Sequence, residues 1–218
     1  MKLTTEQIEA INQTLISTGI KFDDLKMEVL DHIALQIEWE MKTNQTTFLE
    51  AFNQVFNQWE TDLKPTRAFL SLTTYYPKLA RSKFGNQIKL EIIIAIAISS
   101  LLIISFQLVS DSNAKVNFIL WIKKIFFYTY FGTILSVIFL KFLNKKSNIS
   151  STYKHSFDTR FPVIIVWLSI AFNDKIPEGI TNQNILVLLI GFCFVFLLTT
   201  TYLGIKHYQF QKKFSIQP

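Results

Sequence analysis

The stretch "EIIIAIAISSLLIISFQLV" (residues 91–109) decides the class of this chain. After its first residue, Glu91, it contains no charged side chain. At a rise of about 1.5 Å per residue, a helix of this length covers the roughly 30 Å hydrocarbon core of a bilayer. The stretch therefore predicts a membrane-spanning helix, and the other long apolar runs of the chain are expected to lie in the same membrane.

The composition fits a chain divided between a soluble part and a membrane part. Half of the 218 residues are hydrophobic and 21 are Phe, which is more apolar than soluble domains usually are. Residues 1–63 contain 4 lysines and 11 acidic residues, whereas the remainder is strongly basic. Because the basic residues lie at the ends of apolar runs, they indicate membrane topology and argue against a nucleic-acid partner. Cys193 lies inside an apolar run, which predicts an inert thiol.

Four spans are predicted, at about residues 90–110, 120–143, 156–173 and 184–205, within a membrane domain of residues 88–206. The third is the weakest, because its apolar run "FPVIIVWLSIAF" (161–172) has only 12 residues. A re-entrant segment is the alternative there.

Loop charge favours four spans over three, with both termini in the cytoplasm, because basic residues then gather on the cytoplasmic side. The cytoplasmic flanks would carry Lys78, Arg81, Lys83, Lys89, Lys141, Lys145, Lys146, Lys154, Arg160, Lys206, Lys212 and Lys213, and the outer flanks Lys115, Lys123, Lys124 and Lys175. The predicted location is therefore the cell inner (cytoplasmic) membrane, with a multi-pass topology and a short cytosolic tail at residues 207–218.

Residues 1–63 are predicted to form a cytosolic three-helix domain. Thr4 with Gln7, and Thr47 with Glu50, have the spacing of capping boxes at the starts of the first and third helices. Such boxes satisfy backbone N–H groups that a helix start leaves without a partner. The two pairs therefore predict where the first and third helices begin.

Asp23 or Asp24 is expected to cap the second helix of this domain. Residues 64–87 are expected to form a basic helical connector next to the membrane. The predicted fold class is therefore all-α: a small cytosolic helical domain followed by a four-helix transmembrane region.

The second predicted helix contains the adjacent residues Asp31 and His32, the main candidates for chemistry in this domain. Neighbouring residues on a helix point about 100° apart, so these two side chains do not converge on one ligand. Glu28 and His32 could supply two metal ligands, which is fewer than a zinc site needs. We interpret Glu28, Asp31, His32 and Glu38 as a structural seam along the edges of the apolar face, and no metal, cofactor or catalytic residue is predicted here.

Three stretches of this domain carry a resemblance: "LTTEQIEAINQTLISTGI", "DDLKMEVLDHIALQIE" and "FLEAFNQVFNQW". They resemble the N-terminal helical domain of uncharacterised flavobacterial-type membrane proteins and, more distantly, the HAAS and permease-prefix domains. The matching positions are Glu28, Asp31, His32, Glu38, Ala51 and Val55. The resemblance implies a membrane-anchored accessory or regulatory protein, and it supplies no catalytic residue.

The stretch "HSFDTRF" (155–161) holds the remaining candidates, His155, Asp158 and Arg160, at the start of the third predicted span. Asp158 could pair with His155, and Arg160 could hold a phosphate or a lipid headgroup. The alternative interpretation is an interfacial loop with a local ion pair and an arginine that reaches toward water.

The function predicted from the sequence is that of a non-catalytic accessory or regulatory protein of the membrane, whose cytosolic head binds a protein partner. A small transporter or channel subunit is one alternative. A membrane-surface enzyme acting on a lipid or phosphate group near His155 and Arg160 is the other. No cofactor is predicted. The expected partners are the lipid bilayer, a protein at the head and, if the chain forms a homo-oligomer, further copies of itself.

Overall fold

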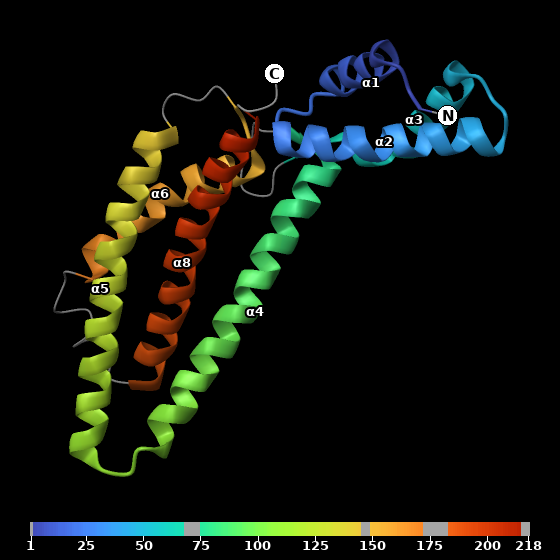
Figure 1. Cartoon of the computed structure of the whole chain (residues 1–218). Helices are drawn as coiled ribbons and strands as arrows, with labels where there is room; N and C mark the ends of the chain where they lie inside the picture. Colours follow the sequence, from blue (N-terminus) through green and yellow to red (C-terminus); the bar gives the residue numbers. More distant parts are fainter. Residues whose placement is uncertain (1, 68–74, 145–148, 172–182, 215–218) are drawn as a thin grey trace. The chain divides into compact units, whose positions relative to one another are not determined.

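The computed structural model describes residues 2–67, 75–144, 149–171 and 183–214, and these are almost entirely helical (Figure 1). The predicted all-helical class is therefore confirmed. The chain forms two compact units. The first, called the head below, comprises Met1–Asn86 with Ile149–Thr152, and the second, called the bundle, comprises Gln87–Asn148 with Tyr153–Pro218.

Three helices make up most of the head: α1 (Thr5–Ser17), α2 (Asp23–Thr43) and α3 (Phe48–Leu63). Both predicted capping boxes are confirmed. The hydroxyls of Thr4 and Thr47 accept hydrogen bonds from backbone N–H groups three residues later. In return, the side chains of Gln7 and Glu50 accept the backbone N–H of the capping threonine, each at 2.9 Å. These reciprocal bonds fix the starts of α1 and α3.

The core of the head is built from one apolar face of each helix. Its fully buried aliphatic members include Ile11, Leu15, Leu25, Val29, Ile33, Ile37, Ala51 and Val55. The core continues beyond α3, because Ala80 is completely buried in the same cluster. Phe84 also packs against it, edge-on to Phe22 with ring centroids 5.6 Å apart. The head therefore extends past the predicted boundary at residue 63, since three short helices bury little apolar surface by themselves.

The connector after α3 differs in part from the helical connector that is predicted for residues 64–87. Residues of β1 (Pro65–Arg67) and β2 (Tyr75–Pro77) form a two-stranded antiparallel ladder, and the helix α4 (Lys78–Leu108) begins after it. A proline disfavours helical backbone in the residue before it. Lys64, which precedes Pro65, accordingly has an extended ψ of 132°. The connector is thus helical from Lys78 onward and extended at both strands.

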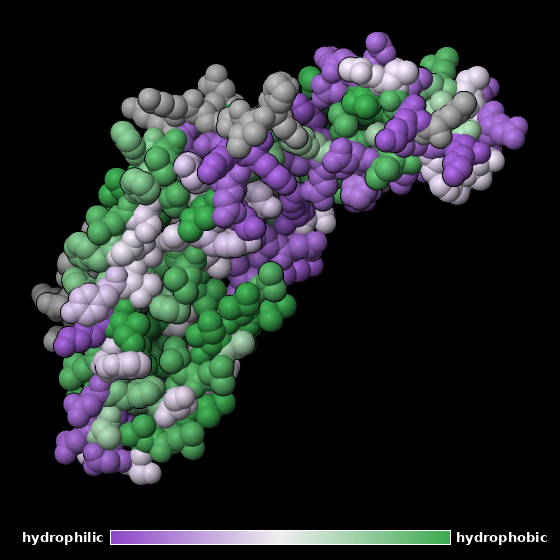
Figure 2. Space-filling model, viewed as in Figure 1, coloured by the Kyte–Doolittle hydropathy of each residue, from purple (hydrophilic) through white to green (hydrophobic). Residues whose placement is uncertain are grey.

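Four helices contribute to the described part of the bundle: α4, α5 (Ser112–Asn144), α6 (Thr152–Ala171) and α8 (Gln183–Phe214). Of α4, the part from Gln87 onward belongs to the bundle, and of α6, the part from Tyr153 onward. Of these, α4, α5 and α8 are long and apolar enough to cross a membrane. They correspond to three of the four predicted spans, at about residues 90–110, 120–143 and 184–205. The remaining one, the third predicted span at residues 156–173, overlaps α6, and its last two residues lie outside the described residues. Figure 2 shows a largely hydrophobic surface along the bundle helices, as lipid-facing helices have.

Side-chain contacts show in which direction α4 and α8 run. The Gln107 side-chain amide donates to the Asn184 side-chain oxygen at 3.0 Å. Farther toward the start of α4, the Ser99 hydroxyl donates to the Leu188 carbonyl at 3.3 Å. Residue numbers fall along one helix as they rise along the other, so α4 and α8 are antiparallel.

Contacts of α6 with α5 and α8 give its direction. The Tyr130 hydroxyl on α5 donates to the Ile164 carbonyl on α6 at 3.1 Å. A Cβ atom added to Gly204 on α8 would lie 2.7 Å from Leu140 on α5 and 2.8 Å from Phe157 on α6. Thus α6 runs antiparallel to α5, whereas α8 runs parallel to α5 (Figure 1). The chain direction alternates through α4, α5, α6 and α8, and α8 ends at the end of the bundle where α4 enters.

Gly191 marks the closest approach of α8 to α4. A Cβ atom at this residue would overlap the Oγ of Ser99 and lie 3.1 Å from its Cα. A change of side-chain rotamer at Ser99 cannot relieve the second contact, since it involves the backbone. Small residues at such crossings let membrane helices pack backbone against backbone.

We expect Gly191→Ala to destabilise the full-length protein in detergent by about 1–3 kcal/mol, because the added methyl group overpacks the crossing. The measurement is the thermal unfolding midpoint. Gly132→Ala on α5 is the matched control, because a Cβ atom there meets nothing within 4 Å. The control should be neutral or slightly stabilising. Equal melting of the Gly191 variant and the native protein would contradict the close approach of the two helices.

Candidate functional site

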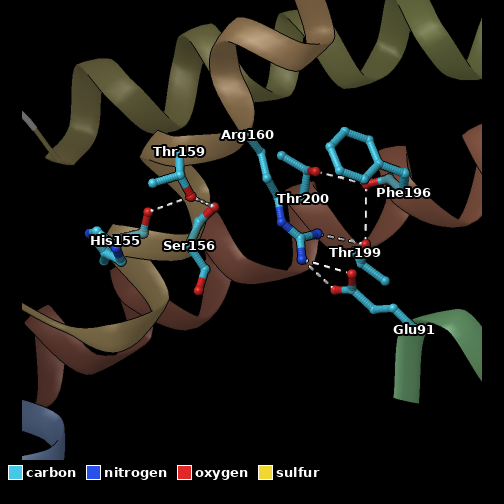
Figure 3. A network of polar contacts seen from close by, with 8 residues as sticks. All are labelled: Glu91, His155, Ser156, Thr159, Arg160, Phe196, Thr199 and Thr200. Carbon is cyan, nitrogen blue, oxygen red and sulfur yellow. Dashed lines mark hydrogen bonds and ion pairs between the residues drawn. The ribbon is translucent and has the colours of Figure 1, made fainter. Parts of the chain in front are cut away.

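Arg160, one of the predicted interfacial candidates, is the centre of a polar network that joins three bundle helices (Figure 3). It projects from α6 toward Glu91 on α4, and its Nη2 lies 2.7 Å from each carboxylate oxygen. Its Nη1 donates to the hydroxyl of Thr199 on α8 at 2.9 Å. The guanidinium also lies over the ring of Phe196, with Cζ 5.2 Å from the centroid.

The network is shielded and internally balanced. The Arg160 and Glu91 side chains are only 11% and 17% exposed, and their opposite charges are in direct contact. Burying an ion pair is costly unless the remaining donors and acceptors are also satisfied. Thr199 meets this need, because its hydroxyl accepts from Arg160 and donates to the Phe196 carbonyl at 3.1 Å. The arrangement therefore holds α4, α6 and α8 together.

The interaction with Glu91 bears directly on the predicted role of Arg160. A guanidinium that holds a phosphate or a lipid headgroup presents its N–H groups to that ligand. Here both terminal nitrogens of Arg160 are used within the protein, one by Glu91 and one by Thr199. The geometry assigns Arg160 a role in helix packing.

The other two interfacial candidates lie on the same helix as Arg160 but not in its network. Asp158 forms an ion pair with Lys154 one turn earlier, at 3.4 Å. Figure 3 shows the His155 ring well apart from the Arg160 guanidinium, so the three candidates do not form one site.

The four seam residues of α2 each lie in a different environment. The Glu28 carboxylate accepts from the Lys83 ammonium on α4 at 2.8 Å. The Glu38 carboxylate accepts the backbone N–H of Leu3 at 3.0 Å, which ties the start of the chain to α2. Both contacts join α2 to another segment of the head.

His32 and Asp31 point in different directions, as the helix geometry predicts. The His32 ring stacks against Trp59 on α3, with centroids 6.5 Å apart and an angle of 25° between the planes. The Trp59 indole N–H in turn donates to the Gln36 side-chain oxygen at 2.6 Å. Asp31 is exposed. His32 thus belongs to the contact between α2 and α3, and Asp31 does not share it.

Sequence reasoning missed the role of Asp23 and Asp24. The backbone N–H of Asp23 donates to the Ser150 carbonyl at 2.7 Å, and its carboxylate accepts the Ser150 N–H at 2.9 Å. The Asp24 carboxylate accepts the Thr152 N–H at 2.8 Å and the Thr152 hydroxyl. The predicted capping of α2 by either residue is wrong, because the cap is Phe22, which makes no side-chain bond there.

The two aspartates act on the start of a different helix. Thr152 is the first residue of α6, and Asp24 satisfies one of the N–H groups that every helix start leaves without a partner. Negative charge is also favourable near a helix N-terminus. Lys83 lies 3.8 Å from the Asp24 carboxylate and balances its charge. Asp24 is 8% exposed, so this contact is part of the folded core of the head.

Within the residues that the structure describes, no group of three or more His, Cys, Asp or Glu side chains could hold a metal ion. Cys193 is buried, in agreement with its apolar sequence surroundings.

Comparison with known proteins finds no matching family model, no matching curated protein and no matching solved structure. The resemblance to HAAS and permease-prefix domains therefore stays a prediction.

Proposed function

We propose that this chain is a non-catalytic membrane protein whose helical head binds a protein partner. The observation that carries this proposal is an exposed apolar pair on α2. Leu35 and Trp39 are 63% and 59% exposed, although the opposite face of the same helix is completely buried. Residues four apart on a helix lie next to each other on its surface. Tryptophan is enriched among the residues that dominate protein–protein binding energy.

The charge of the head indicates what kind of partner would fit this pair. Residues 1–63 contain 11 acidic residues and 4 lysines. Asp31 and Glu38 lie on α2 within one turn of Leu35. An apolar contact surrounded by negative charge favours a partner segment that is apolar and basic, since complementary charge speeds association and excludes acidic competitors.

A non-catalytic role is supported by what the polar candidates do. Arg160 is engaged by Glu91, and Asp24 by Thr152. These contacts hold helices in place, and each uses the charged group that a catalytic role would require.

The binding proposal can be tested with photo-crosslinking amino acids in the full-length protein in native membranes. A probe at Leu35 should give a crosslinked product that Trp39→Glu removes. Likewise, a probe at Trp39 should give a crosslinked product that Leu35→Glu removes. A probe at Asn57, which is exposed on α3, is the matched control. Equal crosslinking at Asn57, or a product that survives both glutamate substitutions, would contradict binding at this pair.

We further propose four membrane crossings, with α6 as the third. The directions of α5 and α8 support this proposal, because two consecutive crossings that run parallel need a return between them. At about 1.5 Å per residue, the 20 residues of α6 measure about 30 Å, which is the thickness of a bilayer core. The positive-inside pattern of the sequence then places both chain ends in the cytoplasm.

A reporter fused after Pro218 is therefore expected to behave as cytoplasmic, with active fluorescent protein and inactive alkaline phosphatase. A fusion after Asp111, between α4 and α5, should show the opposite pattern and serves as the control. A Pro218 fusion with active phosphatase would refute four crossings and favour a re-entrant segment at residues 161–172.

A further inference from the structure

The last turns of α8 carry aromatic and basic side chains beyond the predicted span at residues 184–205. Tyr208 is 40% exposed, and Lys213 is also exposed. Phe210 and Phe214, one turn apart on the same segment, are half-buried, with ring centroids 5.7 Å apart. The sequence has no acidic residue between positions 184 and 218. The segment of residues 206–214, called the α8 end below, is therefore both apolar and basic.

The head offers a surface that is complementary to the α8 end. The exposed pair Leu35 and Trp39 lies on α2, and Asp31, one turn before Leu35, is exposed as well. Lys42 lies almost one turn beyond Trp39, so this surface is acidic at one end and basic at the other. A basic segment is therefore favoured with its charged end next to Asp31 and its apolar part next to Trp39.

Chain connectivity brings both surfaces to one face of the membrane. Phe84 on α4 packs against the head core, and the predicted span of α4 starts only a few residues later, near residue 90. Because α4 and α8 are antiparallel, α8 ends on the side where α4 enters. From Ile205 to Phe214, α8 rises a further 14 Å or so, at about 1.5 Å per residue. In two copies that lie side by side in one membrane, the head of one and the α8 end of the other thus meet the same membrane face.

We propose that the head of one copy binds the α8 end of a second copy. The inference rests on the proposed function and names the partner as this chain itself. Leu35 and Trp39 contact Tyr208 of the second copy, and Asp31 faces its Lys213. Both surfaces are exposed in the single chain, so each is open to a second copy. A two-fold axis gives two equal contacts, because each copy then offers its head once and its α8 end once, and the assembly closes as a dimer.

The test co-expresses two full-length copies with different affinity tags, and places a photo-crosslinking amino acid at Trp39 in the first copy only. Irradiation of native membranes should give a product that carries both tags and has the mass of two chains. Peptide mapping should place the crosslink within residues 206–214 of the second copy. A product with both tags that maps elsewhere would overturn the inference. Crosslinking only to a different protein would also overturn it but leave the proposed function intact, whereas the absence of any product would contradict the proposed function as well.

Charge reversal ties the product to the two surfaces. Asp31→Lys in both copies, or Lys213→Glu in both copies, should reduce the product about tenfold, because like charges then face each other. The two substitutions combined should restore it. Lys89→Glu reverses the same charge at an exposed position on α4 and should leave the product unchanged. An equal loss in Lys89→Glu and Lys213→Glu, or no recovery when Asp31→Lys and Lys213→Glu are combined, would overturn the assignment to the α8 end.

Discussion

Glu91→Leu is expected to cost the full-length protein about 3–5 kcal/mol of stability, since it removes one partner of a shielded ion pair. The Arg160 side chain, 11% exposed in the native protein, then keeps only Thr199 as a hydrogen-bond acceptor in the network. In the apolar interior of a membrane bundle, an arginine without a counterion is strongly unfavourable. The thermal midpoint in detergent, or the midpoint of unfolding in denaturant, measures the loss.

The double variant Glu91→Leu with Arg160→Met should recover most of this stability. Replacing both members of a buried ion pair with apolar residues is often neutral or stabilising, whereas removing one is not. Asp158→Asn is the control on the same helix, because its pair with Lys154 is exposed. Exposed pairs contribute less than about 1 kcal/mol. A double variant as unstable as the single one would show that Arg160 contributes by other contacts, and the importance assigned to the ion pair would be wrong.

The parts of the fold that could be predicted from the sequence are those that depend on near neighbours. The capping boxes at Thr4 and Thr47 involve residues three positions apart, so both could be read from spacing alone. The long apolar runs likewise predicted α4, α5 and α8, because spanning length is a property of one segment. The connector depends on more than one segment. A helical connector is predicted for residues 64–87, but Pro65 and Pro77 each favour extended backbone in the residue before them.

The contacts that build the candidate sites could not be predicted, because their partners are distant in the chain. Glu91 lies 69 residues from Arg160, and nothing in the residues around Arg160 indicates which helix supplies its counterion. Asp24 lies 128 residues from Thr152. The position of Asp24 in the sequence favoured capping of α2, the helix that contains it. In the folded head, the start of α6 lies next to the same carboxylate, and the packing of the head therefore determines which helix Asp24 caps.

Asp24→Asn is expected to destabilise the head by about 1.5–3 kcal/mol, the usual contribution of hydrogen bonds to a charged group. An asparagine has nearly the same shape, but it keeps only one acceptor oxygen for the two donors that Thr152 presents, its backbone N–H and its hydroxyl, which bind different carboxylate oxygens of Asp24. It also removes the charge that faces Lys83 at 3.8 Å. Asp31→Asn makes the same chemical change on the same helix at an exposed position. That control should stay within about 0.5 kcal/mol of the native protein.

Hydrogen exchange of the full-length protein shows where the Asp24 variant opens. The Thr152 N–H donates to the Asp24 carboxylate in the native fold, so its exchange should become faster in Asp24→Ala, which has no acceptor oxygen, and remain slow in Asp31→Ala. Amides in the centre of α2 and α3 should keep their protection if the loss is local to the segment Ile149–Thr152. If they lose protection together with Thr152, the segment is part of the cooperative core of the head. Unchanged exchange at Thr152 in Asp24→Ala would contradict the capping of α6 by Asp24, because that variant has no side-chain oxygen left to accept this N–H.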